Sequence, residues 1–371
     1  MTVAGVTPMS APRERGWRWF VVAVVATVVL TVAPWWPSAL ALPAAVVRLA
    51  LPFEQVALLA VAPLAACTLV GWWAGGRFLV MLMALALAGW LLWHVPLPSS
   101  GYGAFVRGWA LALSAAFGLV CLATAKGPFM GRALLAVALA AVVSGAGLVS
   151  SRSATGVDAL IGTVRMLDED YQRRLDESLS MWKERTKSGI WQTFAARLPK
   201  VAARAEGLAE RLEDLERGSE TRARSLLVLL APALLALESM LALALGWTAY
   251  HRLTRTRIGP PLGPLRDLRF NDQLIWGLVI GAVVGLLPTF AEWRVAGLNL
   301  LCFFGAMYAL RGAGVLSWWL PERAAFPLLL GLVILVPLLG PVPVLMTIIV
   351  ICFGIGLSDT WRDFRATAPA R

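Results

Sequence analysis

The chain has 371 residues, of which 59% are hydrophobic and 15% are charged, and its formal net charge is +11. Soluble domains carry about 25% charged residues, so the composition excludes an ordinary soluble protein and predicts an all-α, polytopic transmembrane bundle. The basic residues lie between apolar runs and not in one patch or tail, which argues against nucleic acid as a partner. The lipid bilayer is therefore the expected environment.

Metal, cofactor and catalytic signals are missing from the sequence. The four cysteines all fall inside apolar runs, where they read as small buried hydrophobes, and the chain holds only two histidines. No P-loop, HExxH motif or nucleophile elbow occurs. We expect no metal, no cofactor and no enzymatic activity. The alternative is an enzyme for lipid-linked substrates that is built from scattered Arg and Asp side chains.

Ten apolar runs approach the length of a spanning helix, which needs about 20 mostly apolar residues. Tryptophans gather at their ends, as is typical of an interfacial aromatic belt. The first run also fits a cleaved signal peptide, and cleavage would leave the remaining topology unchanged. The predicted spans are residues 17–34, 55–75, 78–95, 104–125, 132–150, 226–249, 273–290, 296–317, 324–340 and 342–358.

The distribution of Lys and Arg predicts the orientation of these spans. Cytoplasmic loops carry an excess of both residues, and five arginines lie between positions 252 and 269 alone. With an even number of spans, this asymmetry places both termini in the cytoplasm. The chain divides into an N-terminal membrane half (1–150), a charged insert (151–224) and a C-terminal membrane half (225–371).

The insert, residues 151–224, holds 13 of the 22 acidic residues of the chain, so we place it outside the membrane, and the Lys and Arg distribution places it on the extracytoplasmic side. Apolar residues recur at helical spacing before and after a break at residues 186–189. This pattern predicts a two-helix hairpin. One interpretation is that its helices only pack on each other. The other is a docking surface for a protein partner, or a lid over the membrane domain.

Glu238 is a carboxylate near the middle of the apolar run 226–249. A charge at the bilayer centre costs about 2.5–3.5 kcal/mol on insertion scales, so we expect the group to be buried in the bundle and either neutral or paired. Ala242 and Gly246 follow at i+4 and i+8, and such small residues mark helix–helix contacts. Three roles remain open, namely packing through a hydrogen bond, an ion pair with Arg311, and substrate or proton coupling.

Two further polar residues interrupt the C-terminal spans. Arg311 lies about two turns before a Trp pair, and its long side chain is expected to snorkel to the inner headgroups or to serve as a ligand group. Asn299 begins the eighth predicted span, where a structural hydrogen bond to another helix is the first interpretation and ligand binding the second.

Gly277, Gly281 and Gly285 form a GxxxGxxxG ladder on one helical face. Such a face allows another helix to approach closely. Helix packing is the first interpretation, and a backbone surface that lines a substrate cavity is the second.

Three stretches of the C-terminal half carry a resemblance to a known family. They are RDLRFNDQLIW (Arg266–Trp276), NLLCFFGAMYALRGAGVLSWW (Asn299–Trp319) and GLSDTWRDFR (Gly356–Arg365). They resemble the YybS-like family of bacterial predicted membrane proteins, which is distantly similar to the substrate-binding components of energy-coupling-factor vitamin transporters and to the rod-shape protein MreD. The resemblance implies a bacterial inner-membrane protein. Members often have Gln-Gly where this chain has Arg311-Gly312.

Two functions follow as expectations. The first is a transporter-like or substrate-binding membrane component, which is supported by Glu238, the glycine ladder and the distant kinship. The second is a non-catalytic scaffold in cell-envelope assembly, which is supported by the insert and the likeness to MreD. A polar cavity around Glu238 favours the first, and an exposed apolar stripe on the insert favours the second. The sequence names no substrate.

Overall fold

The computed structural model describes Phe53, Phe364, scattered residues between 199 and 210, and seven continuous stretches. These stretches are residues 56–94, 101–124, 127–151, 156–197, 228–254, 258–319 and 341–362. All regular secondary structure within them is helical, which confirms the predicted all-α bundle. The predicted spans 17–34 and 324–340 lie outside these residues.

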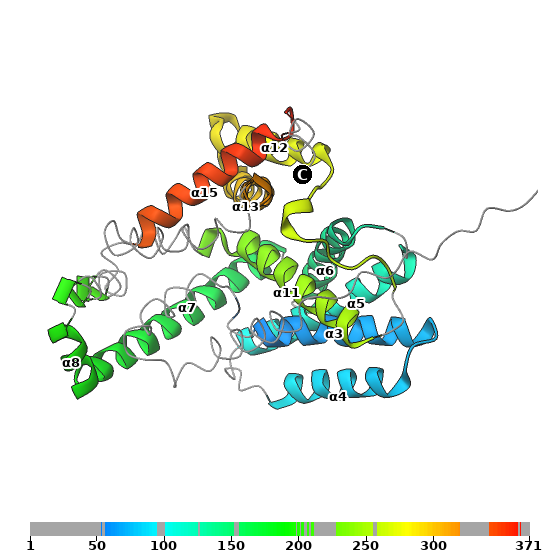
Figure 1. Ribbon diagram of the computed structural model, residues 1–371, viewed down its shortest axis with the longest axis horizontal. Helices are drawn as coiled ribbons and strands as arrows, with labels where there is room; N and C mark the ends of the chain where they lie inside the picture. Colours follow the sequence, from blue (N-terminus) through cyan, green and yellow to red (C-terminus); the bar gives the residue numbers. More distant parts are fainter. Residues whose placement is uncertain are drawn as a thin grey trace, which may run out of the picture.

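The first helical group is formed by α3 (Val56–Trp73), α4 (Phe78–His94), α5 (Gly101–Ala123), α6 (Phe129–Ser151) and α11 (Ala231–Leu253). Helix α3 packs against α4, α5 and α11, and α6 packs against α5 and α11. Figure 1 shows α3 and α4 side by side, with α11 crossing the centre of the molecule.

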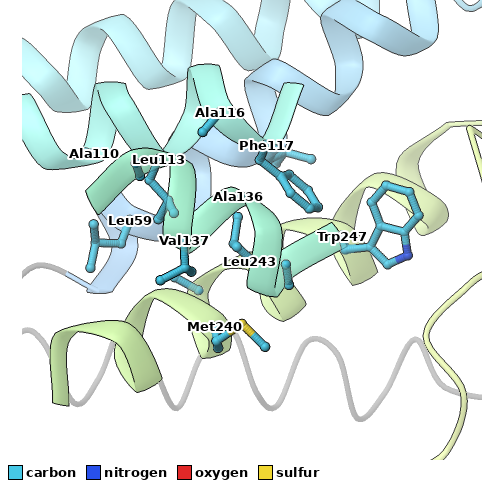
Figure 2. Packing of buried hydrophobic residues seen from close by; sticks show 14 of the residues in the cluster. Leu59, Ala110, Leu113, Ala116, Phe117, Ala136, Val137, Met240, Leu243 and Trp247 are labelled. Carbon is cyan, nitrogen blue, oxygen red and sulfur yellow. The ribbon is translucent and has the colours of Figure 1, made fainter. Parts of the chain in front are cut away.

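A continuous apolar core fills the space between α3, α5, α6 and α11. Figure 2 shows Leu113 and Phe117 of α5 facing Val137 of α6 and Leu243 of α11. In a bilayer, close packing of these side chains stabilises the helix contacts through van der Waals attraction, because lipid is as apolar as the core itself. Around Trp247 the packing is aromatic, since its ring meets that of Phe117 edge-on at a centroid distance of 5.8 Å.

The second group consists of α12 (Ile275–Leu286), α13 (Arg294–Trp319) and α15 (Pro341–Ser358). Helix α13 is central, because it packs against both α12 and α15, and Figure 1 shows the three together. Helix α11 also contacts α13 and so joins the two groups. The division into membrane halves at residues 150 and 225 remains a prediction.

Four helices among the described residues are long and apolar enough to cross a membrane. They are Gly101–Ala123, Phe129–Gly147, Ala231–Leu253 and Pro288–Trp319, of which the last joins a 3₁₀ segment to α13. The prediction of a full span over 273–290 is wrong in extent, because α12 has only 12 residues. Its length is about 18 Å, against a hydrocarbon core of about 30 Å. A 3₁₀ turn at Asp272–Leu274 precedes it and Pro288 opens another after it.

The insert begins with α7 (Gly156–Thr186) and continues, after a short break, with α8 (Gly189–Arg197). The predicted first helix and the predicted break are therefore confirmed. At the break, the rings of Trp182 and Trp191 pack edge-on at 4.8 Å. The apolar face of α7 also reaches the first helical group, because Met166 and Leu167 pack against its core. The predicted second helix of the hairpin lies in part outside the described residues.

Candidate functional site

Glu238 is the eighth residue of α11, so it lies about two turns after the helix begins at Ala231 and not halfway along it. The expected burial is confirmed, since the residue is 3% exposed. Its Oε2 accepts a hydrogen bond of 3.0 Å from the backbone N–H of Phe53. Its Oε1 has no hydrogen-bond partner among the described residues.

Aromatic side chains surround the carboxylate. Phe53, which is fully buried, meets Tyr102 edge-on at 6.1 Å and Phe105 at 5.8 Å. On the next residue of α11, the Ser239 hydroxyl accepts a hydrogen bond of 2.9 Å from the Trp109 indole. Helix α5 thus contributes aromatic side chains to this region, and Phe53, before α3, donates a backbone hydrogen bond to Glu238.

Helix α7 brings charge to the same region. Arg174 and Asp170 pair at 2.8 Å, and their side chains are only 3% and 2% exposed. Arg174 lies close enough to the Glu238 carboxylate to attract it electrostatically, and Tyr102 lies near the same guanidinium. The site therefore combines a buried carboxylate of the membrane helices with a buried ion pair of the insert.

Sequence reasoning missed the contributions of Asp170 and Arg174. Both stand at i,i+4 spacing beside the apolar stripe that includes Leu167 and Tyr171. Charges that flank the buried face of an amphipathic helix are the signal that marks them. Their contacts with the membrane helices could not be predicted from the sequence, because no local pattern in α7 indicates which helix it contacts.

The small residues that follow Glu238 pack as predicted. Ala242 is fully buried. A Cβ atom added to Gly246 would stand 2.8 Å from the Ala60 carbonyl oxygen of α3 and 3.6 Å from the Pro63 side chain. The backbones of α11 and α3 therefore approach each other along this face, which holds Glu238 inside the bundle.

Arg311 forms a separate polar centre, and both structural expectations for it are wrong. It is 5% exposed and does not snorkel, and it does not pair with Glu238. Its Nε donates to Asp359 Oδ2 at 2.9 Å and its Nη1 donates to Asp272 Oδ1 at 2.6 Å. The two carboxylates keep the guanidinium buried, because their ion pairs replace its hydration.

The same centre joins the three stretches that stood out in the sequence. Phe270 and Asp272 come from the first, Arg311 from the second and Asp359 from the last. The guanidinium lies 5.4 Å from the centre of the Phe270 ring. The Asp359 side chain is 2% exposed and faces Arg311.

Asn299 makes the interhelical hydrogen bonds that its position predicted. Its Oδ1 accepts from the N–H of Ala233 at 2.9 Å, and its Nδ2 donates to the carbonyl of Leu229 at 2.7 Å. The first N–H groups of a helix lack partners within it. Asn299 therefore caps α11 from a neighbouring helix and has a structural role.

The glycine ladder also packs as predicted, and its partner is α13. A Cβ atom on Gly277 would overlap the Phe304 ring, and one on Gly281 would stand 3.0 Å from the Leu301 nitrogen. At Gly285 the nearest atom is the backbone carbon of Gly297, at 3.5 Å. The ladder is a helix–helix contact surface.

Among these residues, Glu238 offers the chemistry of a binding site. No group of three or more His, Cys, Asp or Glu residues within the described part of the chain is arranged to hold a metal ion. A buried carboxylate with one occupied and one unoccupied oxygen accepts hydrogen bonds from an amine, amide or hydroxyl group. Arg311 and Asn299, in contrast, are satisfied by the protein itself.

A comparison with known protein families gives a match over most of the chain. Residues 20–357 match the family described as predicted membrane protein (DUF2232). No curated protein and no solved structure matches the chain.

Proposed function

The chain belongs to the DUF2232 family of predicted membrane proteins, and on that premise we propose that it is a transporter-like, substrate-binding component of a bacterial inner membrane. The resemblance to YybS-like proteins, and through them to the substrate-binding components of vitamin transporters, supports this proposal. In this account Glu238 binds the ligand, and the protein has no catalytic activity of its own.

The observation that carries the proposal is the unoccupied Oε1 of Glu238. A buried polar atom without a hydrogen bond costs about 1–3 kcal/mol, and a buried charge costs more. Oε2 is held by the Phe53 N–H group, which fixes the direction of the carboxylate. A ligand that donates a hydrogen bond to Oε1 removes the cost, so the protein binds such a ligand in preference to an apolar one.

Helix α7 regulates access to this site in the proposed mechanism. The Arg174–Asp170 pair is buried together with the Glu238 and Tyr102 side chains. Entry of a ligand therefore requires α7 to move, and its return restores the ion pair. This assigns the insert the role of a lid, which was one of the two interpretations of its apolar stripe.

The experiment compares small molecules that remain bound to wild-type protein and to Glu238→Gln after mild detergent purification, using mass spectrometry of denatured samples. Gln keeps the shape but replaces one acceptor oxygen by a donor. Ser180→Ala, an exposed change on α7, is the matched control. We expect one compound class to be enriched with wild type and Ser180→Ala and absent from Glu238→Gln. Identical small-molecule content in all three, with equal thermal stability, contradicts the proposal.

The alternative is a scaffold in cell-envelope assembly. It is favoured by the length of α7, whose 31 residues extend about 46 Å. Figure 1 shows α7 carrying α8 away from the membrane helices. Cross-linking from an exposed position near Trp182 separates the two functions, since a scaffold gives a defined protein adduct that does not depend on Glu238.

A further inference from the structure

Arg132, in the first turn of α6, is a buried charge that the candidate site does not use. It is 2% exposed. Its Nη1 donates to the Ile258 carbonyl at 3.2 Å, and the Cys121 thiol, a weak acceptor, lies close to the guanidinium; Nε and Nη2 have no oxygen or nitrogen partner among the described residues. No carboxylate in the described part of the chain forms an ion pair with it.

A guanidinium group cannot relieve this situation by losing its proton, because it stays charged at any physiological pH. Its carbon atom lies 5.3 Å from the centre of the Trp247 ring, and this cation–π contact supplies part of the missing stabilisation. A cation–π contact is worth less than the desolvation of a buried charge. The Nε and Nη2 donors of Arg132 therefore favour the binding of an anion.

The guanidinium lies beside two loops near the N-terminus of α6. A Cβ atom on Gly127, in the loop between α5 and α6, would stand 3.7 Å from Arg132 Nε, and one on Gly259 would stand 2.5 Å from Nη1. The N–H groups of Phe129 and Met130 open this 23-residue helix, and such groups lack partners within the helix and attract anions.

We propose that Arg132 and the N-terminus of α6 bind a phosphate group. The Lys and Arg distribution predicts that this end of the bundle faces the cytoplasm, and Arg252 stands in the last turn of α11. Either the headgroup of an anionic phospholipid or a soluble phosphate compound presents the required chemistry. The proposal assumes, as the proposed function does, that the chain is a membrane protein. It does not depend on ligand binding at Glu238.

The test measures the thermal unfolding of delipidated protein in detergent during titration with phosphatidylglycerol, with phosphatidylcholine, or with inorganic phosphate against chloride at equal ionic strength. The variants are Arg132→Gln and Arg132→Lys. Arg266→Gln, at a side chain that is 59% exposed, is the control for unspecific attraction. We expect binding to weaken about tenfold or more in Arg132→Gln, as for the loss of a charge-assisted hydrogen bond. Arg266→Gln should bind as wild type does.

The response of wild type identifies the source of the phosphate group, and the response of the variants tests the site. Stabilisation of wild type by phosphatidylglycerol alone identifies a lipid headgroup, and stabilisation by inorganic phosphate identifies a soluble ligand. If neither raises the unfolding temperature of wild type, or if Arg132→Gln responds as strongly as wild type, the proposal is overturned. Should Arg132→Gln fail to purify, Arg132→Lys takes its place, because lysine keeps the charge but loses the planar donor fork. Equal binding by Arg132→Lys and wild type then overturns it.

Discussion

Glu238 lies where α11, α5 and the segment before α3 converge, with one oxygen held by the Phe53 N–H group. The burial of the neighbouring residues limits which substitutions Glu238 tolerates. Ser239 and Ala242 are fully buried, so the face of α11 that carries the carboxylate is enclosed by other helices. A side chain in this position tolerates a change of charge only if its shape and its acceptor are kept.

We therefore expect Glu238→Gln to express and fold as wild type does, and Glu238→Lys to impair insertion or stability. Lysine introduces a cation that the backbone N–H of Phe53 repels and that small residues such as Ala242 cannot satisfy. Membrane yield and the melting temperature in detergent measure the difference. Equal tolerance of both substitutions contradicts the placement of Glu238 inside the bundle.

The Arg311 guanidinium binds two carboxylates that differ in exposure. The Asp359 side chain is 2% exposed and that of Asp272 is 61% exposed. Breaking a buried ion pair costs about 3 kcal/mol or more, whereas an exposed pair contributes about 0–1 kcal/mol. Asp359→Asn should lower the melting temperature markedly, and Asp272→Asn should lower it little. The reverse order would show that the Asp272 contact dominates.

These residues also mark the limit of what the sequence predicts. The burial of Glu238 followed from its apolar run and its small neighbours, which are local facts. The partners of Arg311 stand 39 and 48 residues away in the chain. No local pattern connects them, so the sequence around Arg311 indicated snorkelling, a ligand role or a pair with Glu238, but not the two aspartates.

At the scale of elements, the α12–α13 pair shows how glycine positions differ in importance. A Cβ atom on Gly297 would overlap the backbone of Gly285, but a Cβ atom on Gly285 would stand 3.5 Å from its nearest neighbour. The two glycines face each other across one contact, yet only one of them has no room for a methyl group.

Gly297→Ala should therefore destabilise the protein by about 1–3 kcal/mol through overpacking. Gly285→Ala should be neutral, or stabilise by up to about 1 kcal/mol through helix propensity. Melting temperatures of the two variants in the same detergent give the comparison. A larger loss for Gly285→Ala would mean that α12 meets α13 in a different register.

The helices themselves were largely predictable, because hydropathy and Trp belts mark them. The extent of α12 was not, since the apolar run continues through Pro288, whereas the helix ends at Leu286. The helical stripe of α7 was predicted, but its contact with the core of α5 and α6 was not. A stripe shows that a face is buried and does not show against what.

At the scale of the whole molecule, the two polar centres and Arg132 occupy different regions of one helical bundle. Glu238 is near the beginning of α11, close to the insert. Arg132 packs against Trp247 near the end of the same helix. If α11 crosses the membrane in the predicted direction, the ligand site faces outward and the phosphate site faces the cytoplasm.

The orientation of the insert is thus the point on which the proposed function depends most directly. Ser188, in the break between α7 and α8, and Gly263, in the exposed loop after α11, are placed on opposite sides by the Lys and Arg distribution. Single cysteines at these positions are treated in intact cells with a membrane-impermeant thiol reagent. The native cysteines, of which three are buried, set the baseline. The account predicts labelling of Ser188→Cys in intact cells and of Gly263→Cys only after the cells are opened. The opposite pattern would contradict it.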